Sequence, residues 1–235
     1  MSLKDNLNKK YSSISNSGMH SVLTNREKNY FKLELSKIKN LQNKKILEIG
    51  FGNGSFLEWS KLNGLNTYGY EINLDFYDKS KNRHKVYLGN GFDFDEKINE
   101  KFDLIIMFDV VEHIIRERLE EFFLKLNHIL NKNGIILMRF PNGSSPFGLY
   151  YFNSDLTHEL FLNKRSMRML CDLTGFEIEY FDNMKRSNYF ESLRGKLFGK
   201  INYLIRDIIE IILGNLYFGE RVKLDPNVVC IIKKL

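Results

Sequence analysis

Three glycines at alternate positions form the stretch of this sequence best suited to hold a ligand. Gly50, Gly52 and Gly54 follow an aliphatic run that ends at Ile49, and apolar residues resume at helical spacing from Phe56. This pattern predicts a strand, a tight turn and a helix. Glycine permits positive φ and has no Cβ, so a ligand can lie against the backbone, and the N–H groups that begin the helix favour electron-rich atoms. The turn is therefore predicted to cradle a ligand.

The glycine spacing and two acidic residues narrow the kind of ligand. A dinucleotide-binding turn has Gly-x-Gly-x-x-Gly, but Ser55 stands where its third glycine would be. Glu48 lies two residues before Gly50, and Glu71 ends the next predicted strand. An acid followed by Gly-x-Gly-x-Gly resembles motif I of the class I S-adenosylmethionine-dependent methyltransferases. The resemblance implies that Glu71 accepts hydrogen bonds from two ribose hydroxyls.

The resemblance also implies the other contacts with S-adenosylmethionine. Relatives usually carry Gly-Asp after the third strand, where the carboxylate accepts a hydrogen bond from the adenine amino group. Asn90 takes that place here, so either its amide oxygen or Asp93 is expected to accept the bond. The full set of expected cofactor contacts is Glu48, Gly50, Gly52, Gly54, Glu71, Ile72, Asn90, Gly91, Phe92, Asp109 and Val110.

A second motif begins where the apolar run from Phe102 turns polar at Asp109. Ligands of open α/β sheets lie at the carboxyl ends of the strands, so Asp109 is expected to face the cofactor. The run Asp-Val-Val-Glu-His-Ile closely resembles the motif of small-molecule methyltransferases of the ubiquinone-biosynthesis type. His113 is either catalytic or packed against the cofactor. Nothing nearby in the sequence completes a set of metal ligands around Asp109, Glu112 and His113, so no metal site is predicted.

A long loop, residues 142–160, follows the fifth predicted strand and ends in Asp-x-x-His. Long loops at the carboxyl edge of a sheet are usually functional. A hydroxyl acceptor benefits from a base during methyl transfer, and a histidine with a near-neutral pKa suits that role. His158 is the candidate. In the alternative interpretation, Asp155 caps a helix that begins near Leu156, and His158 only fixes the loop.

The alternation of strands and helices predicts the framework that positions these residues. The order strand, helix, strand repeats five times between Lys45 and Phe140, and further strands are expected over 176–181 and 227–232. We expect an α/β fold with a doubly wound, Rossmann-like seven-stranded sheet, mostly parallel with an antiparallel last strand. Residues 1–40 are expected to form an N-terminal arm and lead-in helix. The arm is either loose or, as the resemblance implies, folded over the cofactor with Tyr11 and His20 on the substrate side. Residues 41–235 form the methyltransferase domain.

A helical insert is expected at about residues 183–226, between strands six and seven. Apolar residues recur at helical spacing from Ile201 to Leu213. Three roles are open: a lid over the substrate or against the sheet, a homodimer interface, or peripheral membrane contact through the 200–213 helix. Arg206, Asp207 and Glu210 exclude a membrane-spanning helix.

Composition adds weaker constraints. The formal net charge of +6 and pI of about 9.1 fit an anionic partner, and a solvated surface explains them equally well. The polar N-terminus lacks an apolar signal segment, so a cytoplasmic location is expected. Cys171 and Cys230 are predicted to be small core residues.

These observations together predict an S-adenosylmethionine-dependent methyltransferase. By resemblance to enzymes of bacterial surface-polysaccharide synthesis, the expected acceptor is a hydroxyl of a small molecule, a sugar or sugar-phosphate conjugate. A quinone-type phenol or a small-molecule amine is the second possibility. Asp-Val-Val-Glu replaces the Asn-Pro-Pro-Tyr type of motif on which a flipped base stacks, so a nucleic-acid acceptor is not expected. A non-catalytic subunit that binds the cofactor, or a dehydrogenase, is the alternative.

Overall fold

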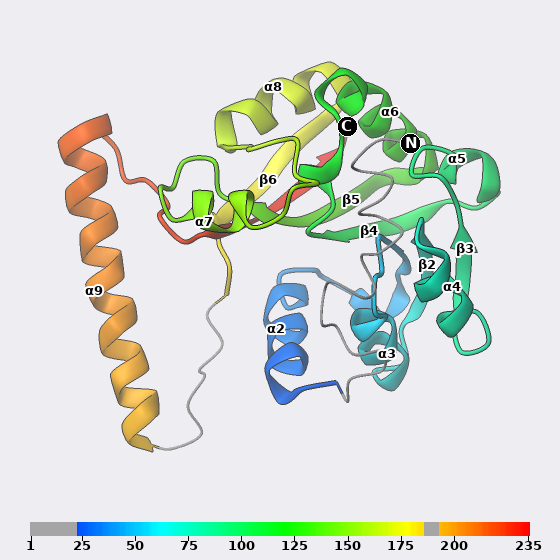
Figure 1. Cartoon of the computed structure of the whole chain (residues 1–235), viewed down its shortest axis with the longest axis horizontal. Coiled ribbons are helices and arrows are strands. Elements are labelled where there is room, and N and C mark those ends of the chain that lie inside the picture. Colours follow the sequence, from blue (N-terminus) through cyan, green and yellow to red (C-terminus); the bar gives the residue numbers. More distant parts are fainter. Residues whose placement is uncertain (1–22, 186–192) are drawn as a thin grey trace.

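A seven-stranded sheet forms the centre of the protein (Figure 1). This computed structural model describes residues 23–185 and 193–235; within the second range, side chains are described from residue 199 onward. Tyr11 and His20 lie outside the described residues. The sheet order is β3-β2-β1-β4-β5-β7-β6, and β7 runs antiparallel to its neighbours β5 and β6. The strands are β1 (Lys45–Ile49), β2 (Asn66–Glu71), β3 (Lys85–Leu88), β4 (Phe102–Phe108), β5 (Leu130–Pro141), β6 (Phe176–Asn183) and β7 (Asn227–Lys234). The expected fold class is confirmed.

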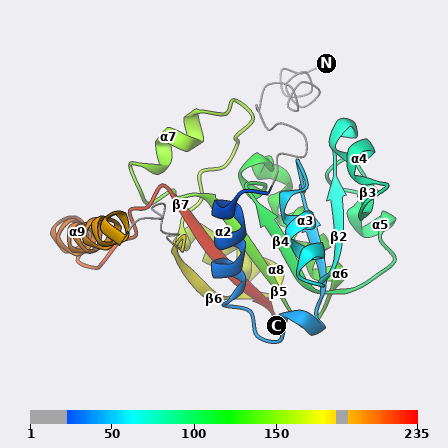
Figure 2. The same cartoon turned by 90° about the horizontal axis from the view of Figure 1, so that it is seen from below.

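Helices cover both faces of the sheet (Figure 2). The α-helices are α2 (Asn25–Leu35), α3 (Ser55–Leu62), α4 (Leu74–Ser80), α5 (Phe94–Lys97), α6 (Leu119–Ile129), α7 (Gly148–Asn153), α8 (Lys164–Thr174) and α9 (Leu193–Phe218). Helices α2 and α3 pack on one face, and α5, α6 and α8 on the other. Short 3-10 helices cover Leu41–Asn43, Val111–His113 and Arg116–Arg118.

The central strand β4 shows why the sheet needs both helical layers. Leu104 and Ile106 point into the layer that contains α2 and α3, whereas Ile105 and Met107 point into the opposite layer. All four side chains are fully buried. A parallel strand that is buried on both faces has a nearly continuous apolar sequence. After Asp103 the next polar residue is Asp109, which directly follows the strand at its carboxyl end.

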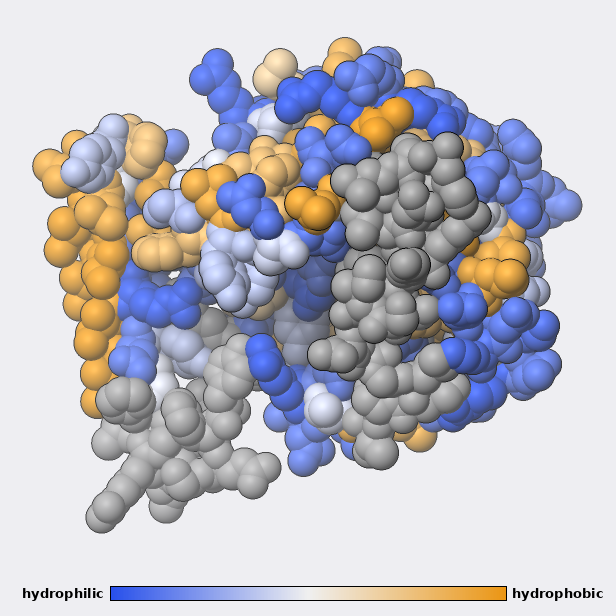
Figure 3. All heavy atoms as spheres, in the orientation of Figure 1, coloured by the Kyte–Doolittle hydropathy of each residue, from blue (hydrophilic) through white to orange (hydrophobic). Residues whose placement is uncertain are grey.

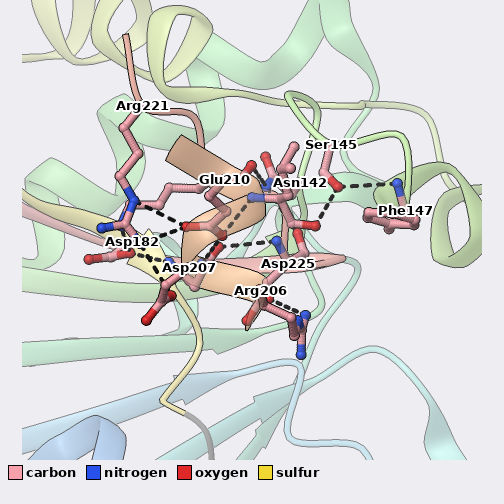
Figure 4. A network of polar contacts seen from close by, with 12 residues as sticks. Asn142, Ser145, Phe147, Asp182, Arg206, Asp207, Glu210, Arg221 and Asp225 are labelled. Carbon is pink, nitrogen blue, oxygen red and sulfur yellow. Dashed lines mark hydrogen bonds and ion pairs between the residues drawn. The ribbon is translucent and has the colours of Figure 1, made fainter. Parts of the chain in front are cut away.

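Helix α9 is longer than the sequence pattern indicated, and it stands beside the rest of the molecule (Figure 1). Its buried Glu210 accepts hydrogen bonds from Asn183 Nδ2 (2.5 Å) and the Leu224 backbone (3.0 Å), and it pairs with Arg221 (2.9 Å). A second ion pair joins Arg206 to Asp225 (Figure 4). Polar contacts therefore hold α9 to the ends of β6 and β7.

The apolar side chains of α9 are largely exposed (Figure 3). They are Ile201, Leu204, Ile205, Ile208, Ile209, Ile211, Ile212, Leu213, Leu216, Tyr217 and Phe218. Across the described ranges, no helix has both the length and the apolar character that crossing a membrane requires.

The loop after β5 does not contain the helix near Leu156 that the alternative interpretation of Asp155 required. No helix begins near Leu156: α7 ends at Asn153, and the next helix begins at Lys164. Asp155 instead accepts hydrogen bonds from the backbone and hydroxyl of Thr157 (2.8 and 2.7 Å), which closes a turn. The core positions of Cys171 and Cys230 are confirmed, since both are free and buried.

Candidate functional site

The glycine turn between β1 and α3 has the backbone conformation that its sequence predicts. Gly50, Gly52 and Gly54 all have positive φ, at 71°, 52° and 78°. A Cβ on Gly50 would lie 2.6 Å from Val110 Cγ2, so the turn and the loop after β4 approach closely only because this residue is glycine. A Cβ on Gly52 would meet no described atom within 4 Å. Gly52 therefore leaves its side of the turn open.

A cavity of about 390 Å³ lies against this turn, at the carboxyl ends of β1, β2 and β4. Nine of the eleven residues expected to contact the cofactor line it: Gly50, Gly52, Glu71, Ile72, Asn90, Gly91, Phe92, Asp109 and Val110. Glu48 and Gly54 do not line it; Gly54 caps α3. The sequence analysis missed Ile49, Tyr70, Asn73, Phe76, Ile114, Ile115, Phe122 and Thr157, which also line the cavity. We call this space the donor cavity.

Glu71 is held rigidly in the wall of the donor cavity. One carboxylate oxygen accepts the Gly52 N–H (2.8 Å), and the other accepts the backbone N–H groups of Ile72 (2.8 Å) and Asn73 (2.9 Å). Burial nevertheless raises the pKa of Glu71. The three N–H groups fix the carboxylate at the strand end, so a ligand meets an acceptor that is already oriented.

Glu48 lies deeper in the structure. The side chain is buried, and its Oε2 has no hydrogen-bond partner among the described residues. Burial, and then the neighbouring Glu71, raise the pKa of Glu48 well above its usual range. Two buried carboxyl groups therefore lie beside one turn, and of these only Glu71 lines the donor cavity.

Asn90 and Asp93 have separate roles in the loop after β3. Asn90 lines the donor cavity, and its amide oxygen accepts the Phe92 N–H (2.9 Å). Asp93 is absent from the lining; its carboxylate accepts the Tyr70 hydroxyl and the Asn90 N–H (3.0 Å). Asp93 thus supports the loop from behind, which leaves Asn90 as the residue of this pair that faces the cavity.

A second and wider cavity, of about 780 Å³, lies on the other side of Asp109. We call it the acceptor cavity. Its lining comes from elements far apart in the sequence: Thr24, Arg26, Glu27, Tyr30, Asp109, Glu112, Arg139, Pro141, Tyr151, Ser154, Asp155, His158, Met184, Lys185, Tyr203, Arg206, Asp225, Pro226 and Asn227. Asp109 lines both cavities. Its backbone has a φ of 57°, and its carboxylate pairs with Arg139, which donates from Nε at 2.8 Å.

The two candidate catalytic histidines lie together between the cavities. His113 lines the donor cavity and His158 the acceptor cavity, and their ring centroids are 4.7 Å apart. The backbone carbonyl of Glu112 accepts the N–H groups of Glu159 (2.7 Å) and Leu160 (3.0 Å), which ties the loop after β4 to the loop after α7. Burial, and then His158, lower the pKa of His113 to about 4, so this ring is neutral near pH 7.

Hydrogen bonds fix the tautomer of each histidine ring. The Thr157 hydroxyl donates to Asp155 (2.7 Å), so it accepts from Nδ1–H of His113 (2.8 Å). Nδ1 of His158 lies 2.8 Å from the Phe152 carbonyl, which can only accept. In each ring Nε2 is therefore the nitrogen that carries the lone pair when the ring is in its neutral form.

The structure also brings His158, which lies in a different loop, close to Glu112 and His113. Ligand atoms of Glu112, His113 and His158 all lie within 4.8 Å of one another. From the sequence no metal site is expected, because nothing nearby in the sequence completes a ligand set around Asp109, Glu112 and His113. In the structure His158, from the loop after α7, lies beside Glu112 and His113. Sequence spacing carries no signal for this approach.

Comparisons with known proteins agree with this geometry. The profile of a family described as "Methyltransferase domain" matches residues 24–180. A SAM-dependent methyltransferase from Archaeoglobus fulgidus has a similar structure, with a TM-score of 0.62, 21% identity, and coverage of 88% of this chain and 94% of that one. Magnesium protoporphyrin IX methyltransferase from Synechocystis PCC 6803, with bound SAH, has a TM-score of 0.61 and 12% identity, covering 99% and 98%.

A protein that is named for a different reaction also has a similar structure. The cyclopropane synthase MmaA2 from Mycobacterium tuberculosis is similar over 91% of this chain and 87% of that one, with a TM-score of 0.59 and 16% identity. A search of curated proteins found no match. At these identities the structural likeness establishes the fold, and the family match carries the assignment.

Proposed function

The chain belongs to the methyltransferase domain family and is an S-adenosylmethionine-dependent methyltransferase; from this premise we propose that it methylates a hydroxyl of a small molecule, a sugar or sugar-phosphate conjugate. The observation that carries the proposal is the junction of two cavities. The donor cavity and the polar acceptor cavity meet at Asp109, and the two histidines lie at this junction. A base at such a junction can reach a hydroxyl that faces the donor.

The residues of the donor cavity fit S-adenosylmethionine. The open side of Gly52 lets a ligand approach the backbone, and Glu71 offers a fixed acceptor for ribose hydroxyls. When bound, S-adenosylmethionine supplies a methyl group on a sulfonium sulfur, a leaving group that needs no activation. The protein must therefore chiefly align the acceptor and exclude water.

We assign His158 and His113 to activation of the acceptor hydroxyl. His158 is half-buried and presents its basic Nε2, because Nδ1–H is held by the Phe152 carbonyl. His113 is held by Thr157 on the donor side of the pair. Loss of the hydroxyl proton at this pair would raise the nucleophilicity of the oxygen, an effect worth about 10²–10⁴-fold in rate.

The lining of the acceptor cavity supports a polar acceptor, because it includes five acidic side chains: Glu27, Asp109, Glu112, Asp155 and Asp225. Four basic side chains also contribute to the lining: Arg26, Arg139, Lys185 and Arg206. Arg139 and Arg206 pair with Asp109 and Asp225. The cavity is wide enough for a conjugate larger than a single sugar ring. A quinone-type phenol or an amine is the second candidate, and it would use the aromatic residues Tyr30, Tyr151 and Tyr203 of the same lining.

Helix α9 also offers a surface on which a membrane or another protein chain could bind. Tyr203 and Arg206 of this helix line the acceptor cavity, while the other side of α9 exposes its apolar residues. A membrane surface or a second copy of the chain would cover such an apolar face. Either partner would lie directly beside the acceptor entrance. Sedimentation with and without lipid vesicles distinguishes binding to a membrane from association with a second copy of the chain.

Two measurements test the function. S-adenosylmethionine should raise the melting temperature through mass action, whereas NAD should leave it unchanged. A panel of nucleotide sugars, phenols and amines is then incubated with the enzyme and the donor, and product masses identify the methylated acceptor. His158→Ala should lower the turnover of that acceptor by about 10²-fold or more. Methylation of phenols or amines without any sugar product would reject the sugar hydroxyl, and unchanged turnover in His158→Ala would reduce His158 to a scaffold.

A further inference from the structure

The cluster formed by Glu112, His113 and His158 contains a buried acid that the methyltransferase framework leaves unsatisfied. Glu112 is 1% exposed, and its Oε2 has no hydrogen-bond partner in the part of the chain that the structure describes. An unpaired buried carboxylate costs several kcal/mol. Such a group normally has a proton or a cation beside it.

The second observation is that both histidines are oriented as metal ligands usually are. A metal-binding histidine almost always donates its other ring N–H to a carboxylate, a backbone carbonyl or water, which fixes the ring and its tautomer. His158 donates to the Phe152 carbonyl. His113 donates to Thr157, whose hydroxyl is held by the Asp155 carboxylate. The lone pairs of both rings lie on Nε2, the atom that a cation needs.

From this geometry we propose that Glu112, His113 and His158 bind one divalent transition-metal ion at the junction of the two cavities. Their ligand atoms lie within 4.8 Å of one another. Two atoms that share an ion at bonds of about 2.2 Å lie at most about 4.4 Å apart, so a small side-chain rotation closes the site. Two imidazoles and a carboxylate suit zinc or iron(II) better than magnesium, which prefers oxygen ligands.

Such an ion would give the two histidines a specific part in the reaction, and this step rests on the proposed function. Three protein ligands leave coordination positions open for the acceptor hydroxyl, whose proton is released to solvent through the acceptor cavity. The oxygen then forms a bond to the methyl carbon as the carbon–sulfur bond breaks, which leaves the methyl ether and neutral S-adenosylhomocysteine. The histidines would then act on the hydroxyl through the ion and not as direct bases, because their Nε2 lone pairs are bound to the metal.

Metal binding can be tested without any acceptor. The full chain, prepared without a polyhistidine tag, is stripped with a chelator and titrated with Zn²⁺, Co²⁺ and Mg²⁺. We expect one equivalent of Zn²⁺ to bind, Co²⁺ to give a visible absorption band, and Mg²⁺ to bind far more weakly. His158→Gln and Glu112→Gln should lose the Co²⁺ band, and Thr157→Val should weaken Zn²⁺ binding by about 10–100-fold. His128→Ala, which removes an exposed histidine of α6, is the matched control and should bind as the unaltered protein does.

The outcomes separate this inference from the proposed function. The melting-temperature increase with S-adenosylmethionine shows that each variant still folds and binds the donor. Failure of the stripped protein to bind Zn²⁺, or equal binding by His158→Gln and His128→Ala, would overturn the metal site and leave the methyltransferase function standing. Binding of one equivalent, together with the absence of methylated sugar, would reject the acceptor class and keep the metal site.

Discussion

The donor cavity and the acceptor cavity are built in different ways. The donor cavity of about 390 Å³ follows consecutive strand ends, and backbone N–H groups fix its main acceptor, Glu71. The acceptor cavity of about 780 Å³ is formed by side chains of α2, β5, α7, α9 and the loops between them. The first is thus a feature of the sheet itself, whereas the second depends on how distant segments pack. Donor binding should therefore tolerate few backbone changes, while acceptor binding should tolerate many.

The largest effect should come from closing the glycine turn. In Gly50→Ala the new Cβ would overlap Val110 Cγ2 at 2.6 Å while φ stays at 71°. Backbone strain of about 1–3 kcal/mol and displacement of Val110 should weaken S-adenosylmethionine binding by about 100-fold. Calorimetric titration measures this loss.

The matched control for that change is Gly64→Ala. Gly64 also has a positive φ, 69°, but its Cβ would meet no described atom within 4 Å, and it lies in neither cavity. The Gly64→Ala variant should lose stability and keep its affinity for the donor. Equal loss of affinity in both variants would show that strain in the chain, not closure of the turn, controls binding.

An intermediate effect is expected at the anchor of α9. Glu210→Gln removes the charge that pairs with Arg221 and leaves buried polar groups partly unsatisfied, at a cost of about 1–3 kcal/mol. Amide hydrogens of α9 should then exchange faster, while donor affinity stays the same. Asp207→Asn, which alters a more exposed partner of Arg221, serves as the control. Weaker donor binding in Glu210→Gln would contradict the independence of the two cavities.

The smallest effect concerns Glu48 and depends on pH. Burial raises the pKa of Glu48 in the folded protein above its unfolded value of about 4.5. The folded state therefore binds more protons than the unfolded state above that pH, and stability is lost as the pH rises towards the folded pKa. Glu48→Gln removes this loss. Without cofactor, it should be more stable than the unaltered protein at pH 8 by about 1 kcal/mol or more, and the gain should vanish below pH 4.

Thermal unfolding between pH 4 and pH 8 measures the Glu48 effect. Glu96→Gln, at an exposed position of α5, should give no such pH-dependent gain. A gain in Glu48→Gln that is constant across the range would show that packing, not ionisation, is responsible.

The sequence predicted the donor cavity well because its signals are local. The glycine turn directly follows β1, Glu48 lies within β1, and Glu71 ends β2, so each signal lies within a few residues of the strand that positions it. The acceptor cavity lacks such signals. His158 approaches Glu112 through contacts between two loops, and Asp155, which could have capped a helix, closes a turn with Thr157 instead. Arg139 offered one missed clue, since it is a charged residue within the otherwise apolar run from Ile135 to Phe140.

The two main-chain bonds that Glu112 accepts, at 2.7 and 3.0 Å, have an evolutionary consequence. Because these bonds, and the one from His158 to Phe152, end on carbonyl oxygens that every residue type possesses, substitutions along α7 can reshape the acceptor cavity without moving the histidines apart. One scaffold can in this way change its substrate while its reactive centre stays in place.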